Sequence, residues 1–512
     1  MNWIDFHLPV LLILLPLMGG VISIFLKWEH IAWLWTTMIS SLVFVGSGRL
    51  LYLLHQLQGL KTQDGLIPSH ISYFIGSWPR QWGIELRIDP LNIIFILVVS
   101  LMFFIVTVYA RRSIASEIPG DRIHFFYSIW MLAITGLLGI LVTGDAFNIY
   151  VLLEISSLTI YTLIAMGKER DPRALTASFR YLIQGSIGAS FILLGIGYLL
   201  MITGTLNLQD MREQLLLLDD FSRNRTVMVA SAFLMVGLGL KMALFPLHFW
   251  LPNAYAYAPS AVSALLAATA TKVGVYMFFR FVFTVLDAGH RIYFVSIRDL
   301  IMICAGSGVL ICSLMAIYQQ NIKKMLAYSS VAQVGYIVLG LALNNEAGIA
   351  GSLVHVINHA LIKGGMFMAV GAVTYRCGAN MLSDFRGLGR QMPWTMAAFT
   401  AGGFGLIGFP LTAGFVSKWY LIRGAVEAGA WPVTVVILIG SLLAVIYVWR
   451  IIETIYFVAP ENPERSVQEA PLSMLLPTLL VIAASLYFGF DAMLTGSLAE
   501  QAARVMLSGG LP

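Results

Sequence analysis

The chain consists largely of apolar runs that are each long enough to cross a lipid bilayer, and this feature constrains its fold more than any other. A transmembrane helix needs about 20 predominantly apolar residues. Applied along the 512 residues, that rule finds 14 candidate spans. They lie near residues 7–26, 31–54, 90–110, 123–142, 146–167, 174–204, 226–246, 258–286, 300–318, 326–343, 348–373, 392–428, 431–458 and 471–490. We therefore expect an all-α polytopic membrane protein with about 14 transmembrane helices.

Composition excludes the soluble classes of protein. Hydrophobic residues make up 59% of the chain and charged residues 11%, whereas soluble globular proteins carry about 25% charged residues. Such a chain cannot cover itself with a solvated surface, which excludes a soluble enzyme, a nucleic-acid-binding protein and a disordered protein. The 3 cysteines have neither the number of a disulfide framework nor the spacing of an iron–sulfur or zinc site. We expect no metal and no cofactor.

Two of the expected spans contain residues that interrupt a helix. The seventh carries Pro246 and Pro252, and the twelfth, 392–428, is too long for one span and is rich in glycine around Pro410. Irregular backbone is tolerated inside a membrane only where protein buries it or a wet cavity lies beside it. Paired interruptions, one in each half of a chain, are typical of transporters built from inverted repeats.

Loop composition gives a modest orientation signal. All loops are short except 55–89. The short loops on the side opposite 55–89 carry more lysine and arginine, which favours that side as cytoplasmic and places both termini outside. Lys323 and Lys324 open the tenth span, so we expect them to anchor it at the membrane interface. The loop 55–89 is then extracytoplasmic.

Five ionisable side chains lie inside apolar spans: Glu154, Lys241, Lys272, Lys363 and Lys418. A charge at the centre of a span costs about 2.5–3.5 kcal/mol on an insertion scale, so chance retention of all five is implausible. Structural alternatives remain for four of them. Lys363 and Lys418 can extend their stems toward water, Lys241 can bind carbonyls freed at the helix break, and Glu154 can belong to a structural ion pair.

The eleventh span carries a polar stripe of His355, His359 and Lys363, each four residues apart. That spacing places the three on one helix face. Two such histidines could bind a metal, but the next turn brings a lysine and no third ligand is visible. Imidazoles titrate near neutral pH, so the stripe suits proton passage better. The structural alternative is hydrogen bonding to neighbouring helices.

Several motifs, in order along the chain, resemble those of the antiporter-like subunits shared by respiratory complex I, membrane-bound hydrogenases and Mrp cation/proton antiporters. They are 237–252 for the broken seventh helix of that family, 258–276 for the eighth, 321–336 for the tenth, 359–367 for the eleventh and 408–419 for the broken twelfth. The similarity covers the chain from about 85 to 455.

The resemblance implies a fold and a set of roles. The fold is two inverted five-helix repeats, spans 4–8 in 123–286 and spans 9–13 in 300–458, between N-terminal helices in 1–122 and a last helix with a short tail in 459–512. The implied proton pathway comprises Glu154 on the fifth helix, its seventh-helix partner Lys241, the connecting Lys272, the link of His355, His359 and Lys363, and the terminal Lys418. We assign no role to Ser156 and Ser157.

The branch of the family is indicated by two departures from complex I. Members of complex I commonly have Asp-Ala-His after the Leu-Pro of the seventh helix, whereas this chain has Asn253 and Tyr255 at the acid and histidine positions. Lys418 in place of a glutamate is also similar to the D-type Mrp subunit. The resemblance therefore implies a bacterial plasma-membrane subunit of a multisubunit Na⁺/H⁺ antiporter, a transporter and not an enzyme, that works with other membrane subunits.

Two alternatives stay open at this point. The same residues can carry protons in a redox-driven assembly such as complex I or a membrane-bound hydrogenase, in which a partner supplies the electron transfer. A scaffold without transport is the third reading. The five intramembrane charges argue against a scaffold, because apolar side chains would pack at lower cost.

Overall fold

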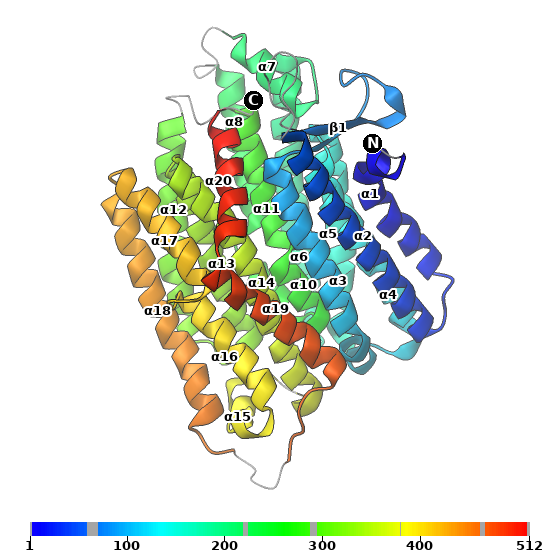
Figure 1. Ribbon diagram of the computed structural model, residues 1–512, viewed down its shortest axis with the longest axis vertical. Helices are drawn as coiled ribbons and strands as arrows, with labels where there is room; N and C mark the ends of the chain where they lie inside the picture. The colour runs from blue at the N-terminus through cyan, green and yellow to red at the C-terminus, as the bar shows by residue number, and fades with distance from the viewer. Residues whose placement is uncertain are drawn as a thin grey trace.

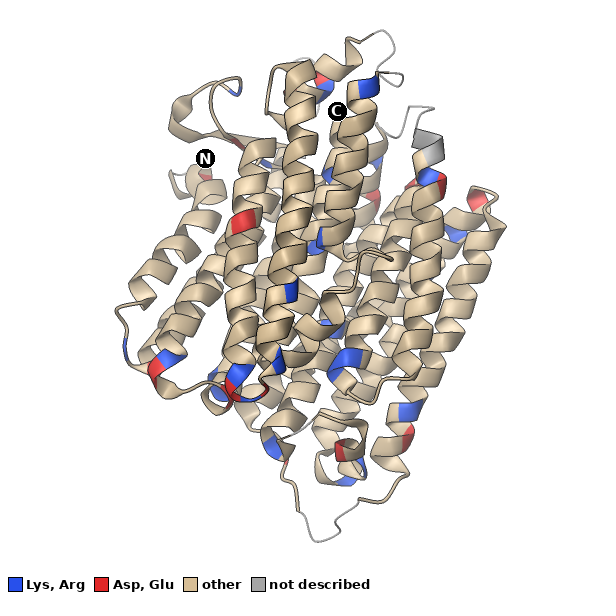
Figure 2. Ribbon diagram, turned by 180° about the vertical axis from the view of Figure 1, so that it is seen from behind, with Lys and Arg blue, Asp and Glu red and all other residues tan. Residues whose placement is uncertain are grey.

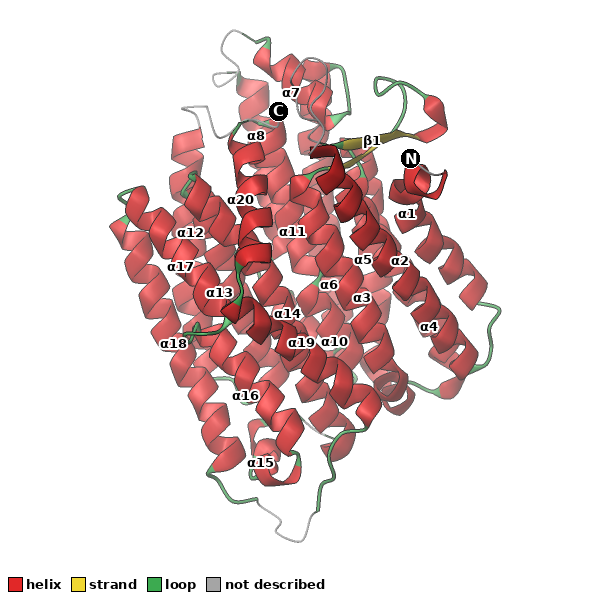
Figure 3. Ribbon diagram, in the orientation of Figure 1, coloured by secondary structure: helices red, strands yellow, loops and turns green. Residues whose placement is uncertain are grey.

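The computed structural model describes residues 3–58, 70–218, 224–286, 294–378, 380–460 and 466–508, and nearly all of them are helical (Figure 3). The long helices are α1 (Trp3–Ser23), α2 (Glu29–Gln58), α3 (Pro90–Glu117), α4 (Ile123–Val142), α5 (Ala146–Ala165), α6 (Arg173–Thr203), α8 (Arg225–Met242), α12 (Phe294–Ile317), α13 (Ile322–Ala342), α14 (Glu346–Cys377), α18 (Trp431–Tyr456) and α19 (Leu472–Phe490). The shorter ones are α7 (Leu208–Leu216), α9 (Leu251–Tyr257), α10 (Ser260–Ala268), α11 (Ala270–Phe279), α15 (Leu388–Gln391), α16 (Pro393–Ile407), α17 (Ala413–Glu427) and α20 (Met493–Leu507). Single turns are η1 (Ile75–Ser77), η2 (Gly120–Arg122), η3 (Met166–Glu169), η6 (Leu382–Phe385) and the π-helical η5 (Arg280–Val285).

The helices form one bundle of roughly aligned rods, with both chain ends at the same end of the bundle (Figure 1). The antiparallel strands β1 (Ile71–Phe74) and β2 (Glu85–Ile88) lie at that end, which we call the hairpin face. The end that carries α15 is the opposite face. Charged residues gather at the two ends, and isolated basic residues lie within the bundle (Figure 2).

The expected fold class is confirmed. Thirteen helical segments of the described part are long and apolar enough to cross a membrane. The predicted twelfth span completes the set of 14 as two half-helices, α16 and α17, which are too short to span a membrane alone. Gly408, with φ of 84°, ends the first half-helix, as the glycine-rich sequence predicted. The boundaries of the two inverted repeats stay a prediction.

The seventh and eighth spans are both interrupted. Helix α8 ends at Met242, Ala243 adopts φ of 59°, and the chain resumes as α9 only at Leu251, as the two prolines predicted. A second interruption was not predicted: Thr269 separates α10 from α11. Its hydroxyl donates to the carbonyl of Leu265 within the same segment, and a threonine of this kind carries little sequence signal because it also occurs in continuous helices.

The described part of the C-terminal tail forms a further helix. Residues 493–507, expected as a tail, fold as α20 and pack against α14 and α3. With 15 residues it is too short to be recognised as a span of its own. Together α19 and α20 run from the opposite face to the hairpin face, and Gly489 lies against Leu411 and Thr412 in the break between α16 and α17.

Helix α14 is the central element of the bundle. Every residue from Ala347 to Thr374 is buried. Helices α3, α10, α13, α16, α17, α19 and α20 surround it. Any polar side chain on α14 therefore faces protein on all sides and must find its partners there. This placement puts the stripe predicted on the eleventh span at the centre of the bundle.

Candidate functional site

All seven candidate residues lie in the described part of the chain. Glu154 is on α5, Lys241 in the last turn of α8, Lys272 on α11, His355, His359 and Lys363 on α14, and Lys418 on α17. The five from Lys272 to Lys418 are no more than 5% exposed, whereas Glu154 and Lys241 are half-buried. Five titratable groups are therefore held almost completely out of solvent.

Lys241 reaches α5 through Ser157, which lies three residues after Glu154. The Nζ atom of Lys241 donates to Ser157 Oγ at 2.8 Å. The Glu154 carboxylate attracts Lys241 electrostatically, but the ion pairs found among the described residues include none between these two. The predicted pairing is therefore indirect, and Ser157, which had no role in the prediction, holds the lysine near the acid. Ser156 instead donates to the carbonyl of Leu153 in its own helix.

Three of the lysines sit where a helix segment ends. Lys241 lies in the last turn of α8, Lys418 Nζ donates to the carbonyls of Leu406 and Ile407 at the end of α16 at 3.1 and 2.9 Å, and Lys272 Nζ donates to the carbonyl of Ala267 at the end of α10. The last carbonyls of a helix lack partners within the helix and form the negative end of its dipole. The ends of α10 and α16 thus each bind a lysine ammonium inside the bundle, whereas Lys241 donates to Ser157.

The stripe on α14 connects two of these places. His355 Nε2 donates to Gln333 Oε1, and His355 Nδ1 forms a hydrogen bond with Ser417 Oγ, both at 2.8 Å. Both nitrogens of His355 therefore have partners within the protein. The two imidazoles stack with centroids 6.2 Å apart. Neither nitrogen of His359 has a hydrogen-bond partner in the described part, although the side chain is buried.

Lys363 and Lys418 flank the two histidines. Lys363 Nζ donates to the Leu326 carbonyl at 2.9 Å and to Ser329 Oγ, both on α13. Lys418 Nζ also donates to Ser441 Oγ at 2.9 Å and lies 4.9 Å from the centre of the Tyr336 ring, a cation–π contact. The structure therefore brings together Lys272, His359, Lys363, His355 and Lys418, whose charges act on one another.

The pair at Glu154 and this central group are separate clusters, and two tyrosines lie between them. Tyr181 on α6 is close to Ser157, and Tyr255 on α9 is close to Thr271, which precedes Lys272. Tyr255 also donates to the Leu266 carbonyl at 2.9 Å. The sequence analysis placed neither tyrosine in the pathway and noted Tyr255 only at a histidine position of the family, because an aromatic side chain in an apolar span is usually a packing residue. These two tyrosines differ from packing residues because their hydroxyl groups lie beside polar side chains, Ser157 and Thr271.

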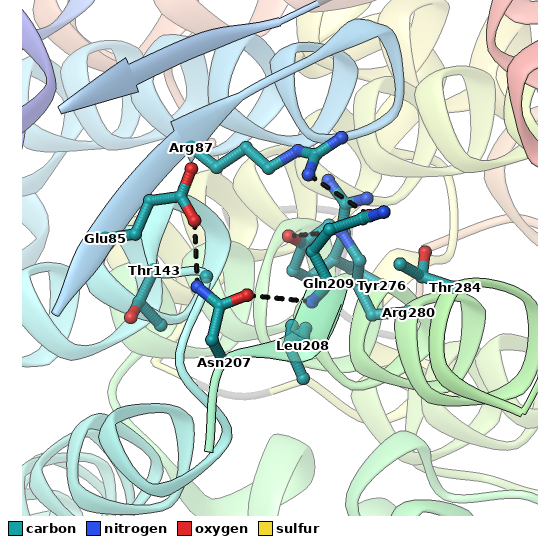
Figure 4. Close-up of a pocket in the computed structure, with 10 residues that line it drawn as sticks. Glu85, Arg87, Thr143, Asn207, Leu208, Gln209, Tyr276, Arg280 and Thr284 are labelled. Carbon is teal, nitrogen blue, oxygen red and sulfur yellow. Dashed lines mark hydrogen bonds between the residues drawn. The ribbon is translucent and has the colours of Figure 1, made fainter. Parts of the chain in front are cut away.

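A polar pocket at the hairpin face is lined by Glu85 and Arg87 of β2 and by Asn207, Tyr276 and Arg280 (Figure 4). Tyr276, four residues after Lys272, donates to the Leu141 carbonyl and accepts from Arg280 Nε at 2.9 Å. Arg280 Nη2 also donates to Asp89 Oδ2 at 2.6 Å, and both side chains are more than nine-tenths buried. Burial raises the pKa of Asp89, but the charges of Arg280 and Arg87 outweigh it and hold the pKa below its usual range.

We expect Asp89→Asn to lower stability strongly. Asparagine caps a helix as well as aspartate, so the hydrogen bonds that Asp89 accepts at the start of α3 survive. The buried Arg280 charge, however, loses its partner, which costs about 3–5 kcal/mol. The measurement is the thermal unfolding midpoint in detergent. Glu427→Gln, which removes an exposed pair with Arg423, is the control and should shift the midpoint little.

Comparison with known proteins agrees with this geometry. The family model described as NADH:quinone oxidoreductase/Mrp antiporter, transmembrane, matches residues 143–446. The N-type subunit of the NADH-quinone oxidoreductase of Desulforudis audaxviator is 44% identical over 421 residues, 80% of this chain and 82% of the relative. The D-type subunit of the Na⁺/H⁺ antiporter of Bacillus subtilis is 29% identical over 501 residues, 98% of this chain and 97% of the relative.

A solved structure extends the likeness to three dimensions. A chain of the membrane-bound sulfane sulfur reductase, an archaeal respiratory membrane complex, superposes with a TM-score of 0.87 at 29% identity, over 98% of this chain and 99% of that one. The matched family region includes every one of the seven candidate residues. The resemblance found in the sequence motifs is thus confirmed: the chain is a polytopic membrane protein that belongs to the NADH:quinone oxidoreductase/Mrp antiporter transmembrane family.

Proposed function

We propose that the chain is the proton-translocating subunit of a multisubunit Mrp-type Na⁺/H⁺ antiporter in a bacterial plasma membrane. One observation carries the proposal: titratable side chains, two half-buried and five buried, extend in two clusters from Glu154, beside the break of the seventh span, to Lys418 at the break of the twelfth. We call these seven residues the file. Burying so many titratable groups is costly. A scaffold would gain nothing from that cost, whereas a proton pathway requires groups that take up and release protons.

The helix-end carbonyls explain how a lysine in the file can change its charge. A protonated lysine is stabilised by carbonyl oxygens at the negative end of a helix, and burial favours the neutral form. The charge state then depends on neighbouring charges. A proton arriving at Lys272 repels a proton on Lys363 or His359, so protons advance one after another toward Lys418. At the other end, the Glu154 carboxylate draws a proton onto Lys241, with Ser157 holding the lysine in place.

The exchanged cation takes a different route in this proposal. Apart from Glu154, every titratable side chain of the file carries nitrogen, and a protonated lysine or histidine repels Na⁺. We therefore place the Na⁺ path at an interface with another membrane subunit. The proposal needs such partners, and the relative from Bacillus subtilis is itself named as one subunit of an antiporter.

A redox-driven assembly is the second candidate, favoured by one specific observation. The relative from Desulforudis audaxviator, at 44% identity, is a subunit of an NADH-quinone oxidoreductase. In that case the same file carries protons and a partner protein supplies the energy from electron transfer. The motif at Asn253 and Tyr255 and the lysine at position 418 favour the antiporter.

Subunit composition separates the two candidates. We expect the native complex, extracted in mild detergent and identified by mass spectrometry, to contain other small hydrophobic subunits and no flavin, nickel or iron–sulfur protein. In vesicles that contain the complex, the internal pH should then change when Na⁺ is added, without any electron donor. Co-purification of a peripheral redox arm, with proton movement only when an electron donor is added, would establish the second candidate instead.

A further inference from the structure

A buried charge cluster outside the file lies near the opposite face, at the joint between α9 and α10. Lys323, expected at the membrane interface, is 2% exposed. Its Nζ donates to the carbonyl of Ala258, the residue after α9, at 3.1 Å. The expectation was wrong because the chain folds the α9–α10 joint over the start of α13. Lys324, the next residue, remains half-buried, as its position at a helix start suggests.

Glu117, at the end of α3, binds the same α9–α10 connection at the start of α10. Both carboxylate oxygens accept from the backbone N–H of Ser260, the first residue of α10, at 3.1 and 3.0 Å. Ser113 Oγ donates to the same carboxylate at 2.9 Å, and Arg170 Nη1 at 3.3 Å. Glu117 is 9% exposed, whereas the Arg170 side chain is 28% exposed. The cluster is therefore buried but reaches the surface beside Arg170.

The two charged groups are close to each other and to an unpaired hydroxyl. They bind backbone atoms of Ala258 and Ser260, which are separated by one residue, and the Glu117 charge attracts Lys323 electrostatically. Arg170 also acts on both, and Tyr109 and Ser113 face Glu117 from α3. The buried hydroxyl of Ser260 has no hydrogen-bond partner among the described residues.

Helix α13 connects this cluster to the file. Lys363 binds the carbonyl of Leu326 and the hydroxyl of Ser329, three and six residues after Lys323. At a rise of about 1.5 Å per residue, these positions lie only about 4.5 and 9 Å along the helix from Lys323. On α14, Thr374 adds a second buried hydroxyl without a partner in the described part, eleven residues beyond Lys363 toward the opposite face. Polar atoms of α13 and α14 therefore lie between Lys323 and Lys363.

We propose that Glu117 and Lys323 form the entrance through which protons from the opposite face reach Lys363, an inference that rests on the proposed function. A proton from surface water forms the O–H bond of the Glu117 carboxylic acid. That bond breaks as the proton passes to Nζ of Lys323, and Lys323 releases it toward the Ser329 and Lys363 site. Arg170 cannot play this part, because a guanidinium stays protonated.

A purely structural role explains the cluster less well. Arg170 already neutralises Glu117, so a joint of α9 and α10 needs no second cation. A buried lysine is costly, and a neutral donor would satisfy the Ala258 carbonyl. The lysine differs from such a donor in being able to lose its proton.

The test compares three substitutions of these two residues in vesicles that contain the complete complex. We expect Lys323→Gln and Glu117→Gln to reduce Na⁺-dependent proton flux by about tenfold or more. Lys323→Arg should reduce it equally, because arginine keeps the charge and a donor for Ala258 but does not release the proton. Lys324→Gln and Lys324→Arg are the matched controls on the neighbouring residue and should transport like the wild type.

Flux is normalised to the amount of assembled complex, and Glu154→Gln is measured alongside as the reference for the file. Normal flux in Lys323→Arg would show that the cluster needs only a cation at this position and would refute the proposed entrance. Normal flux in Glu117→Gln would refute it as well. If Glu154→Gln transports normally as well, the proposed function itself fails. If Glu154→Gln loses flux while all three cluster variants transport normally, the proposed function stands and only the proposed entrance is refuted.

Discussion

Replacing Glu154 with glutamine is expected to abolish proton transport while the complex still assembles. Glutamine has the same size, and Glu154 is half-buried, so the fold loses little. The variant removes both the proton-carrying carboxyl group and the negative charge that attracts Lys241. The bond from Lys241 to Ser157 survives, so the lysine stays in place but loses the group that draws a proton onto it. Loss of one acid–base group predicts a decrease of about 100-fold or more.

The measurement is Na⁺-dependent pH change in vesicles containing the variant complex. Glu169→Gln is the matched control, because Glu169 is an exposed glutamate at the end of the same span and pairs with Arg122 on the surface. It should transport like the wild type. Normal transport in both variants would contradict the proposed role of Glu154.

From the physical arguments alone the file could be predicted only as separate fragments, and the resemblance to a known family supplied their order. The cost of a charge in an apolar span singled out Glu154 and the four lysines, and the spacing of four residues placed His355, His359 and Lys363 on one face. Both arguments act within a single helix. Which helices lie opposite is decided by packing between segments far apart in the chain, so Ser157 opposite Lys241 and Ser417 opposite His355 could not be predicted.

The breaks in the helices show the same division. Proline and glycine alter the backbone directly, so the interruptions after Met242 and at Gly408 were predictable. Thr269 interrupts the eighth span without such a residue, and the carbonyl of Ala267 at the end of α10 binds Lys272. Lys323 was misplaced for a related reason: its position in the sequence is the start of a span, and only the folded chain shows that the α9–α10 joint covers it.

The second large effect concerns Gly408, where the backbone places Lys418. Gly408 adopts φ of 84°, a left-handed conformation that costs other residues about 1–2 kcal/mol. A methyl group there would lie 2.9 Å from Cδ of Lys418 and 3.5 Å from its Nζ. We expect Gly408→Ala to push the Lys418 ammonium off the carbonyls of Leu406 and Ile407. A displacement of about 1 Å in such a site can cost about 100-fold in rate, so proton flux should fall to near background.

Substitution of Gly429 separates the two effects of Gly408→Ala, which are backbone strain and displacement of the Lys418 ammonium. It also adopts a left-handed conformation, with φ of 66°, but a methyl group there has no other atom within 4 Å. Gly429→Ala therefore carries the same kind of backbone strain without moving Lys418, and we expect assembly to be slightly weakened and flux per complex to be normal. Equal losses of flux in both variants would attribute the effect to strain. A loss confined to Gly408→Ala would tie transport to where the Lys418 ammonium sits on the end of α16, because the two variants differ in little else.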